Sequence, residues 1–255
     1  MTEWLVLFTA ALLGGALNAV AGGGSFLTFP ALLFVGVAPI SANTTSTAAL
    51  LPGVFASITG YRDDFPKARG FVLWLSVASL IGGLAGAVFL LHTPEAAFKR
   101  LVPYLLGIAT LLFMLSNRLA TWMGRGERTA TELSARALAG LIVAQIAIAF
   151  YGGYFGGGIG ILMLATLGLM GMRDIHAMNA VKTLLAAIIN TIAFIAFVLA
   201  RNIVWPLAIV MLFGSSLGGY MGARYVRRFD QAVVRRFIAA VGITMTVYFF
   251  IQYGF

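Results

Sequence analysis

Long apolar stretches, separated by short polar clusters, dominate the pattern of the chain. About 20 apolar residues in a helix cross the roughly 30 Å hydrocarbon layer of a bilayer. Boundaries read from such a pattern are good to a few residues. The segments that we predict to span a membrane are Trp4–Ala21, Ser46–Gly60, Gly70–Leu91, Leu101–Ser116, Ala137–Tyr151, Ala177–Leu199, Val204–Ala223 and Phe237–Ile251.

Two further apolar segments, Phe26–Val37 and Ile159–Gly171, are too short to cross a bilayer unaided. Each of them follows a run of three glycines, Gly22–Gly24 in the first half and Gly156–Gly158 in the second. We therefore predict an all-α polytopic membrane protein with eight clear spans and up to ten segments. Whether the two short segments complete a crossing or form re-entrant hairpins is left open.

Composition supports this fold class. Of 255 residues, 61% are hydrophobic and 10% are charged, whereas a soluble domain is about half apolar and about a quarter charged. The net charge of +9 might suggest a nucleic-acid partner. In a membrane protein, an excess of Lys and Arg instead reflects the orientation of the loops. The lipid bilayer is therefore the expected surroundings, and no nucleic-acid partner is expected.

The two halves of the chain repeat each other. The motif GGLAGA at Gly82–Ala87 returns as GGYMGA at Gly218–Ala223, with an offset of 136 residues. GVAPISANTTST at Gly36–Thr47 lies over GMRDIHAMNAVK at Gly171–Lys182, with an offset of 135. Duplicated halves with glycine-broken segments in matching positions are typical of secondary transporters. We predict two repeat units, residues 1–118 and 136–255, joined by a linker over residues 119–135.

Positive charges in the loops indicate how the two units are oriented. If neither short segment changes the side of the chain, the loop Lys and Arg divide eight against eight, which violates the positive-inside bias. If the second short segment reverses the side, thirteen lie with the central linker. Only Lys99, Arg100 and Arg201 then lie opposite, and Lys182 is left inside the membrane. This count predicts inverted repeats, with the linker on the cytoplasmic side of the cell (inner) membrane and both termini outside.

The glycine runs predict a polar cavity. A helix broken inside a bilayer leaves backbone N–H and C=O groups that protein, water or a ligand must satisfy. The helix that restarts after the break presents free N–H donors and a partial positive charge, which suit an anion. Close helix packing through small residues is the alternative, and we favour it for GGLAG and GGYMG. Pro30 is expected to kink or end the first short helix.

Polar side chains follow both glycine runs. Those of the first half are neutral, whereas Asn179, Lys182 and Thr183 share one face of a helix in the second. Lys182 is an intramembrane cation and hence a candidate functional residue, although its side chain could instead snorkel to the headgroups. His176 is read as an interface histidine. The predicted substrate-binding residues are Gly22, Gly23, Gly24, Ser25, Asn43, Thr44, Ser46, Gly156, Gly157, Gly158, Asn179, Lys182 and Thr183.

Acidic residues are missing from every predicted span. This absence disfavours a carboxylate proton relay and a cation site built from acids. Hydroxyls, amides, helix N-termini and one lysine instead fit a small oxyanion as the substrate. No cofactor, metal site or catalytic residue is expected.

The chain resembles the TauE/SafE family of sulfite and organosulfonate exporters. The motifs that carry the resemblance are AGGGSFLTFPALLFVGVAPISANTTST in the first half, GGYFGGGIGILMLATLGLMGMRDIHAMNAVKTLL in the second, and the later GGLAGA and GGYMGA. The resemblance covers nearly the full length. It implies transport of small anions, with sulfite, sulfonates such as sulfoacetate, and thiosulfate as the proposed substrates.

We therefore expect a secondary transporter of a small, sulfur-containing oxyanion, working by alternating access at a site formed by both repeats. A channel or carrier for a small neutral solute is one alternative. A membrane protein without transport activity, such as an intramembrane enzyme or an assembly factor, is another. The sequence contains no HExxH, GxSxG or Walker-type motif, which disfavours intramembrane proteolysis of the commoner kinds and ATP-driven transport by this chain. A homo-oligomer is left open.

Overall fold

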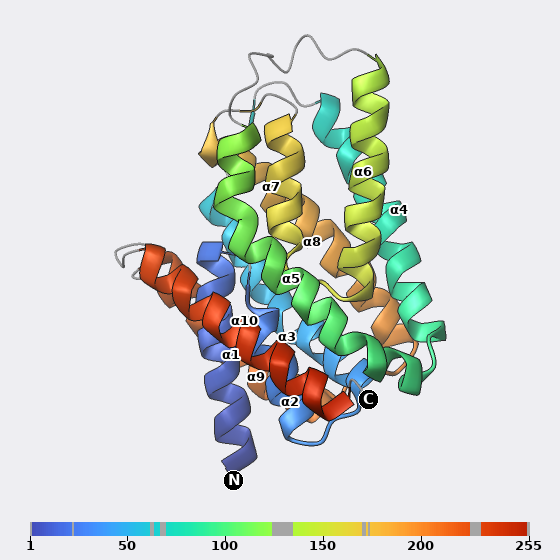
Figure 1. Cartoon of the computed structure of the whole chain (residues 1–255), viewed down its shortest axis with the longest axis vertical. Helices are drawn as coiled ribbons and strands as arrows, with labels where there is room; N and C mark the ends of the chain where they lie inside the picture. Colours follow the sequence, from blue (N-terminus) through green and yellow to red (C-terminus); the bar gives the residue numbers. More distant parts are fainter. Residues whose placement is uncertain are drawn as a thin grey trace.

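The computed structural model describes residues 2–21, 23–61, 64–66, 70–123, 135–169, 172, 174–224 and 231–253. All regular secondary structure in these residues is helical, as the apolar pattern predicts (Figure 1). The ten helices are α1 (Thr2–Ala21), α2 (Ser25–Phe34), α3 (Pro39–Gly60), α4 (Gly70–His92), α5 (Glu95–Met123), α6 (Ala135–Tyr154), α7 (Ile159–Leu169), α8 (Ile175–Leu199), α9 (Trp205–Arg224) and α10 (Gln231–Tyr253).

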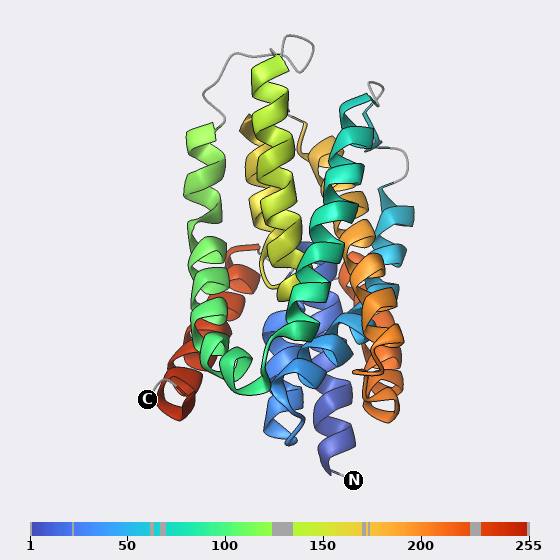
Figure 2. The same ribbon diagram turned by 90° about the vertical axis from the view of Figure 1, so that its right-hand side faces the viewer.

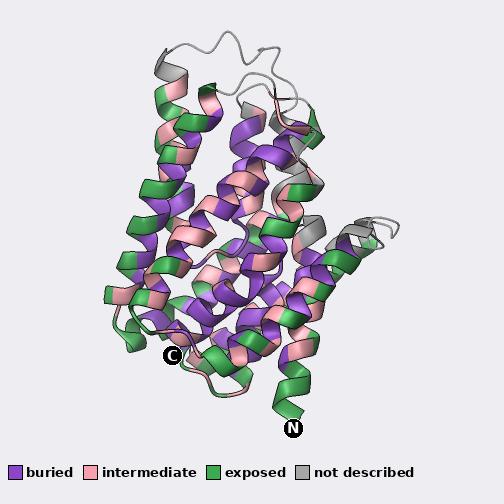
Figure 3. Cartoon of the chain, turned by 180° about the vertical axis from the view of Figure 1, so that it is seen from behind, coloured by how far each residue is buried: buried purple, intermediate pink, exposed green. Residues whose placement is uncertain are grey.

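Three described segments are long and apolar enough to cross a membrane by themselves: Gly70–His92 in α4, Glu95–Leu115 in α5 and His176–Leu199 in α8. Apolar side chains also cover the outer faces of the helices, as with Leu73 and Phe213, which are 66% and 65% exposed. Figure 3 shows the buried residues gathered along the inward faces of the helices. Such a surface suits a lipid environment. The count of eight spans stays a prediction.

The helix boundaries differ from the predicted ones mainly at α3. It begins at Pro39, seven residues before the predicted start at Ser46, so the polar run lies within the helix. Proline suits the first turn of a helix, where no N–H partner is needed. Two hydroxyls of the run bond to carbonyls one turn earlier: Thr44 to Ser41 at 3.1 Å and Thr47 to Asn43 at 3.0 Å.

The two short helices match their predicted segments closely. Both α2 and α7 begin within one residue of the predicted position, at Ser25 and Ile159. The expectation that Pro30 could end the first of them is wrong, because α2 continues through Pro30 to Phe34. Proline costs a helix an internal hydrogen bond and adds a steric clash, and here both are borne by a buried residue whose neighbours pack tightly around it.

The broken helix pairs enter the molecule from opposite ends. In Figures 1 and 2, α1 rises from the lower end to about mid-height, and α2 returns to the lower end. In the same views, α6 descends from the upper end to about mid-height, and α7 returns upwards. Helices α1 and α6 are both 20 residues long, and α2 and α7 have 10 and 11 residues. Two glycine breaks are thus placed near the middle of the molecule.

Helices α4 and α9 pack outside the half of the chain to which they belong. Helix α9 packs on α1 and α3, and α4 packs on α6 and α8. The result is two interlocked groups, which we call body A (α1, α2, α3 and α9) and body B (α6, α7, α8 and α4). They meet where α3 contacts α8, and α5 and α10 pair with each other.

Small residues allow the backbones of these helices to approach closely. A side chain at Gly82 or Gly86 of α4 would clash with the backbone of α6 at Ile146 and Phe150. One at Gly218 of α9 would likewise clash with the backbone of α1. The prediction that the GGLAG and GGYMG motifs serve helix packing is therefore confirmed.

Candidate substrate cavity

The break between α1 and α2 is a tight junction. Its glycines are partly a packing device, because a Cβ atom at Gly24 would lie 2.7 Å from the carbonyl oxygen of Gly14 in α1. Helix α2 then restarts with a bond from the Phe26 N–H to the carbonyl of Gly23 at 3.2 Å. Gly22 lies outside the described residues. Both described glycines of this run are buried, and neither belongs to the cavity wall described below.

The break between α6 and α7 requires glycine for its backbone conformation. Gly156 and Gly158 have φ angles of +81° and +77°, a left-handed region that residues with a Cβ atom rarely adopt. The N–H of Gly156 closes the end of α6 on the carbonyl of Tyr151 at 3.2 Å, and the N–H of Ile161 starts α7 on the carbonyl of Gly158 at 3.1 Å. The first residues of α7 therefore face the middle of the molecule.

A cavity of about 60 Å³ lies between the two breaks. On the same measure, a single water needs only about 10–15 Å³, so the cavity can hold a small solute. Its wall is contributed by both bodies, α1–α3 on one side and α6–α8 on the other. The residues that line it are Asn18, Ser25, Thr47, Leu50, Val54, Ser57, Gly156, Ile159, Gly160, Lys182, Thr183, Ala186 and Asn190.

Lys182 is held in the wall by two neighbours. Its Nζ donates a hydrogen bond of 3.0 Å to Oδ1 of Asn179, one turn earlier on α8. Its aliphatic stem lies along α7 at Gly160, where a Cβ atom would come within 3.3 Å of the lysine Cδ. Gly160 thus provides the space in which the lysine stem packs. An ammonium has three donor hydrogens, so this single printed bond leaves capacity for a ligand.

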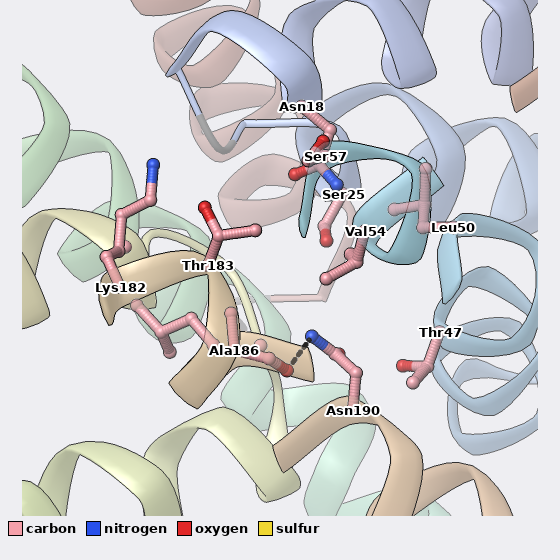
Figure 4. Close-up of a pocket in the computed structure, with 13 residues that line it drawn as sticks. Asn18, Ser25, Thr47, Leu50, Val54, Ser57, Lys182, Thr183, Ala186 and Asn190 are labelled. Atoms are coloured by element: carbon pink, nitrogen blue, oxygen red, sulfur yellow. Dashed lines mark hydrogen bonds between the residues drawn. The ribbon is translucent and has the colours of Figure 1, made fainter. Parts of the chain in front are cut away.

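Figure 4 shows Lys182 and Thr183 on one side of the cavity and Asn18, Ser25 and Ser57 on the other. In the part of the chain that the structure describes, the side chains of Asn18, Ser25 and Thr183 line the cavity without a protein hydrogen bond. The Ser57 hydroxyl donates to the carbonyl of Gly53 at 2.9 Å, which leaves its oxygen lone pairs as acceptors. The cavity therefore offers hydroxyl and amide donors beside one ammonium group.

The polar run of α3 serves helix contacts more than the cavity. Asn43 donates to the carbonyl of Tyr154 at the end of α6, at 3.0 Å. Thr44 donates to the carbonyl of Asn202 after α8, at 2.8 Å. The Ser46 hydroxyl lies 2.6 Å from that of Thr28 in α2.

Of the predicted binding residues, the structure brings Ser25, Gly156, Lys182 and Thr183 together in the cavity wall. Asn179 is one hydrogen bond behind this wall. Gly157 packs instead against the ring of Phe155, which a Cβ atom would approach to 2.9 Å. The remaining described candidates lie outside the wall: Gly23, Gly24, Asn43, Thr44, Ser46 and Gly158. His176 is exposed at the start of α8, where its backbone N–H is capped by Asp174.

Four polar lining residues were missed by sequence reasoning: Asn18, Thr47, Ser57 and Asn190. A signal for Thr47 was present, because the repeat with an offset of 135 places it over Lys182. Asn18 and Asn190 are isolated amides within apolar segments, which is itself a sign of a polar environment inside a membrane protein. Ser57 carries no such signal, since serine is common where membrane helices pack.

Comparison with known sequences identifies the family. The profile of the family "Sulfite exporter TauE/SafE" matches residues 7–249. The chain belongs to the TauE/SafE family. This membership agrees with the resemblance seen in the glycine motifs, and it makes the chain a multi-pass membrane protein of a transporter family. No solved structure matches the chain.

Named relatives of this TauE/SafE chain are also transporters. A "Probable membrane transporter protein" of Haemophilus influenzae is 28% identical over 243 residues, which cover 94% of this chain and 92% of the relative. The "Probable membrane transporter protein YfcA" of Escherichia coli K12 is 30% identical over 246 residues, covering 94% and 87%. The "Probable membrane transporter protein ORF9" of a Sinorhizobium species is 28% identical over 247 residues, covering 94% and 90%.

Proposed function

We propose that this TauE/SafE protein is a secondary transporter of small anions, of the sulfite and sulfonate type, with its binding site in the cavity between the two glycine breaks. The observation that carries the proposal is the wall of that cavity. It combines Lys182 with hydroxyl and amide groups and includes no acidic residue among those described. The starts of α2 and α7 add partial positive charge at Ser25 and Ile159. Together these groups favour an anion over a cation or an apolar solute.

The proposal includes two inverted repeats, residues 1–118 and 136–255, with the linker over 119–135 on the cytoplasmic side of the inner membrane. Matching contacts support it. The first and fifth glycines of GGLAGA, in α4, pack on α6, and those of GGYMGA, in α9, pack on α1. The second glycines, Gly83 and Gly219, face α8 and α3 respectively. Helices α6 and α8 are the counterparts of α1 and α3 under the same repeat, so equivalent residues make equivalent contacts.

Alternating access would then be a movement of body A against body B around the cavity. Hydrogen bonds between α3 and the second half of the chain join the two on one side of the molecule. Thr44 donates to the carbonyl of Asn202 at 2.8 Å, and Thr45 accepts from the N–H of Val204 at 3.0 Å. Each such bond contributes about 0.5–1.5 kcal/mol. A small set of them can therefore close one side and still be broken during a transport cycle.

The proposed function is tested by flux into proteoliposomes. Purified protein is reconstituted, and uptake of labelled sulfite and methanesulfonate is measured with and without a pH gradient. Saturable uptake above that of protein-free liposomes is expected. At an effective dielectric constant near 20, a charge pair 4 Å apart gains about 4 kcal/mol, and desolvation removes much of this. A net loss of about 1–2 kcal/mol, or roughly 5- to 30-fold in anion affinity, is expected for Lys182→Met.

A matched control separates the site from the overall charge of the protein. Lys99 is an exposed lysine on α5, with its Nζ 4.6 Å from the centre of the Tyr253 ring, and it does not line the cavity. Lys99→Met should therefore transport like the parent. Lys182→Arg keeps the charge and loses the geometry, so its affinity should fall between those of parent and Lys182→Met. Absence of anion uptake by a folded parent protein would refute the proposed function.

A further inference from the structure

The cavity contains a single formal charge. Among the described residues, Lys182 is the only lysine or arginine in its wall, and its printed partner is the neutral amide of Asn179. No described acid lines the cavity. The acids that the structure describes are Glu3, Asp64, Glu95 and Asp174.

The rest of the wall divides into a polar part and an apolar part. Asn18, Ser25 and Thr183 supply hydroxyl and amide groups, whereas Leu50 and Val54 supply hydrocarbon on the α3 side. Neutral donors stabilise an anion that is already compensated by a cation. They do not replace a second full charge, because an uncompensated charge in a membrane interior costs at least several kcal/mol.

From this balance we propose that the cavity selects its ligand by charge, accepting small monoanions and rejecting dianions of the same shape. The proposal rests on the proposed function and names the charge class of its substrate. For sulfite itself it means that bisulfite, with one negative charge, is the species that binds. A ligand with a single anionic head and a short apolar group would meet both parts of the wall.

The internal repeat shows where a second charge could be added. Thr47 corresponds to Lys182 at the offset of 135 residues, and both residues line the cavity. They stand on α3 and α8, the helices through which bodies A and B meet. The site is thus asymmetric in charge although the elements that build it are repeated. Lysine at position 47 would give the cavity two cations, one from each repeat.

The test uses three ligands that share a tetrahedral sulfur centre and differ in charge: dimethyl sulfone, methanesulfonate and sulfate, with charges of 0, −1 and −2. Affinity is measured in detergent at one pH, by calorimetry and by ligand-induced stabilisation of the full chain. The parent protein should bind methanesulfonate at least about tenfold more tightly than either of the other two, which corresponds to about 1.4 kcal/mol. In Lys182→Met, the preference for methanesulfonate over dimethyl sulfone should be lost.

The decisive variant is Thr47→Lys, in which sulfate should gain at least about tenfold relative to methanesulfonate. Thr47→Met is the control for size, because it adds a side chain of similar length without the charge, and it should keep the parent order. If Thr47→Lys does not fold, the parent and Lys182→Met series still decide the question, because each has its own expected order of the three ligands.

The outcomes separate the inference from the proposed function. Equal affinity of the parent for methanesulfonate and sulfate, or tighter binding of sulfate, would overturn the selection by charge and leave anion transport standing. Tightest binding of dimethyl sulfone would overturn both and favour a carrier for neutral solutes. Binding of none of the three, together with no anion uptake in proteoliposomes, would also overturn both.

Discussion

Two glycines of α9 provide a sharp test of how the helices are held together. At Gly214, an added Cβ atom would lie 2.6 Å from the carbonyl oxygen of Phe8 and 3.1 Å from the Cβ of Ala11, both in α1. At Gly219, the nearest atom to an added Cβ is the Cα of Gly53, at 3.6 Å. Alanine should therefore disturb the protein at the first position and fit at the second.

The magnitudes follow from these distances. An ordinary Cβ contact begins at 3.4 Å, so Gly214→Ala requires α1 and α9 to separate by about 0.8 Å. A gap of about 0.5–1 Å forfeits roughly a quarter to a half of each van der Waals contact, and this is the most extensive helix pair in the molecule. We expect a loss of about 1–3 kcal/mol. Gly219→Ala removes a flexible residue from a helix, which contributes up to about 1 kcal/mol of stability.

The assay is thermal unfolding in detergent, followed by the fluorescence of the four tryptophans. Gly214→Ala should lower the apparent Tm, and Gly219→Ala should leave it unchanged or raise it. Each variant serves as the control for the other, since both replace a glycine of the same helix by alanine. A Gly214→Ala protein as stable as the parent, or equal destabilisation by both changes, would refute the close approach of α1 and α9.

Three further changes test the site and its orientation. Gly156→Ala should reduce flux and cost about 1–3 kcal/mol of stability, because a Cβ atom is strained at φ +81°; uptake and thermal unfolding are measured together. Thr183→Val removes a hydroxyl that faces the cavity and should weaken anion binding by about 0.5–1.5 kcal/mol in calorimetry, whereas unchanged affinity would take this hydroxyl out of the site. Single cysteines replacing Gly126 and Phe229 should react with an impermeant reagent from the cytoplasmic side and one replacing Thr93 from outside; labelling of the first two from opposite faces would contradict inverted repeats.

Helices and their packing glycines were predictable because they depend on local properties of the sequence. The length of an apolar stretch sets whether it can form a membrane helix, and glycines four residues apart on one face allow a close neighbour. The short helices α2 and α7 were predicted to within a few residues for the same reason, since three glycines in a row stop a helix wherever they occur. The repeat itself was visible as matching motifs at offsets of 135 and 136 residues.

The start of α3 was not predictable in this way. Ser41, Asn43, Thr44 and Thr47 are polar enough to suggest a loop or a binding segment. In the folded chain, Thr44 and Thr47 bond to carbonyls of their own helix, so polarity does not interrupt the helix. Local composition cannot distinguish a hydroxyl that serves its own backbone from one that awaits a ligand.

The tertiary structure alone decided which polar residues meet in the cavity. Lys182 and Thr183 face it, whereas Asn43 turns to the carbonyl of Tyr154, more than a hundred residues away in the sequence. A buried polar group must find a partner, and the partner depends on which helices pack together. The exchange of α4 and α9 between the halves, which places α3 against α8, determines that choice. No property of either helix taken by itself contains it, because the exchange arises from contacts between distant segments.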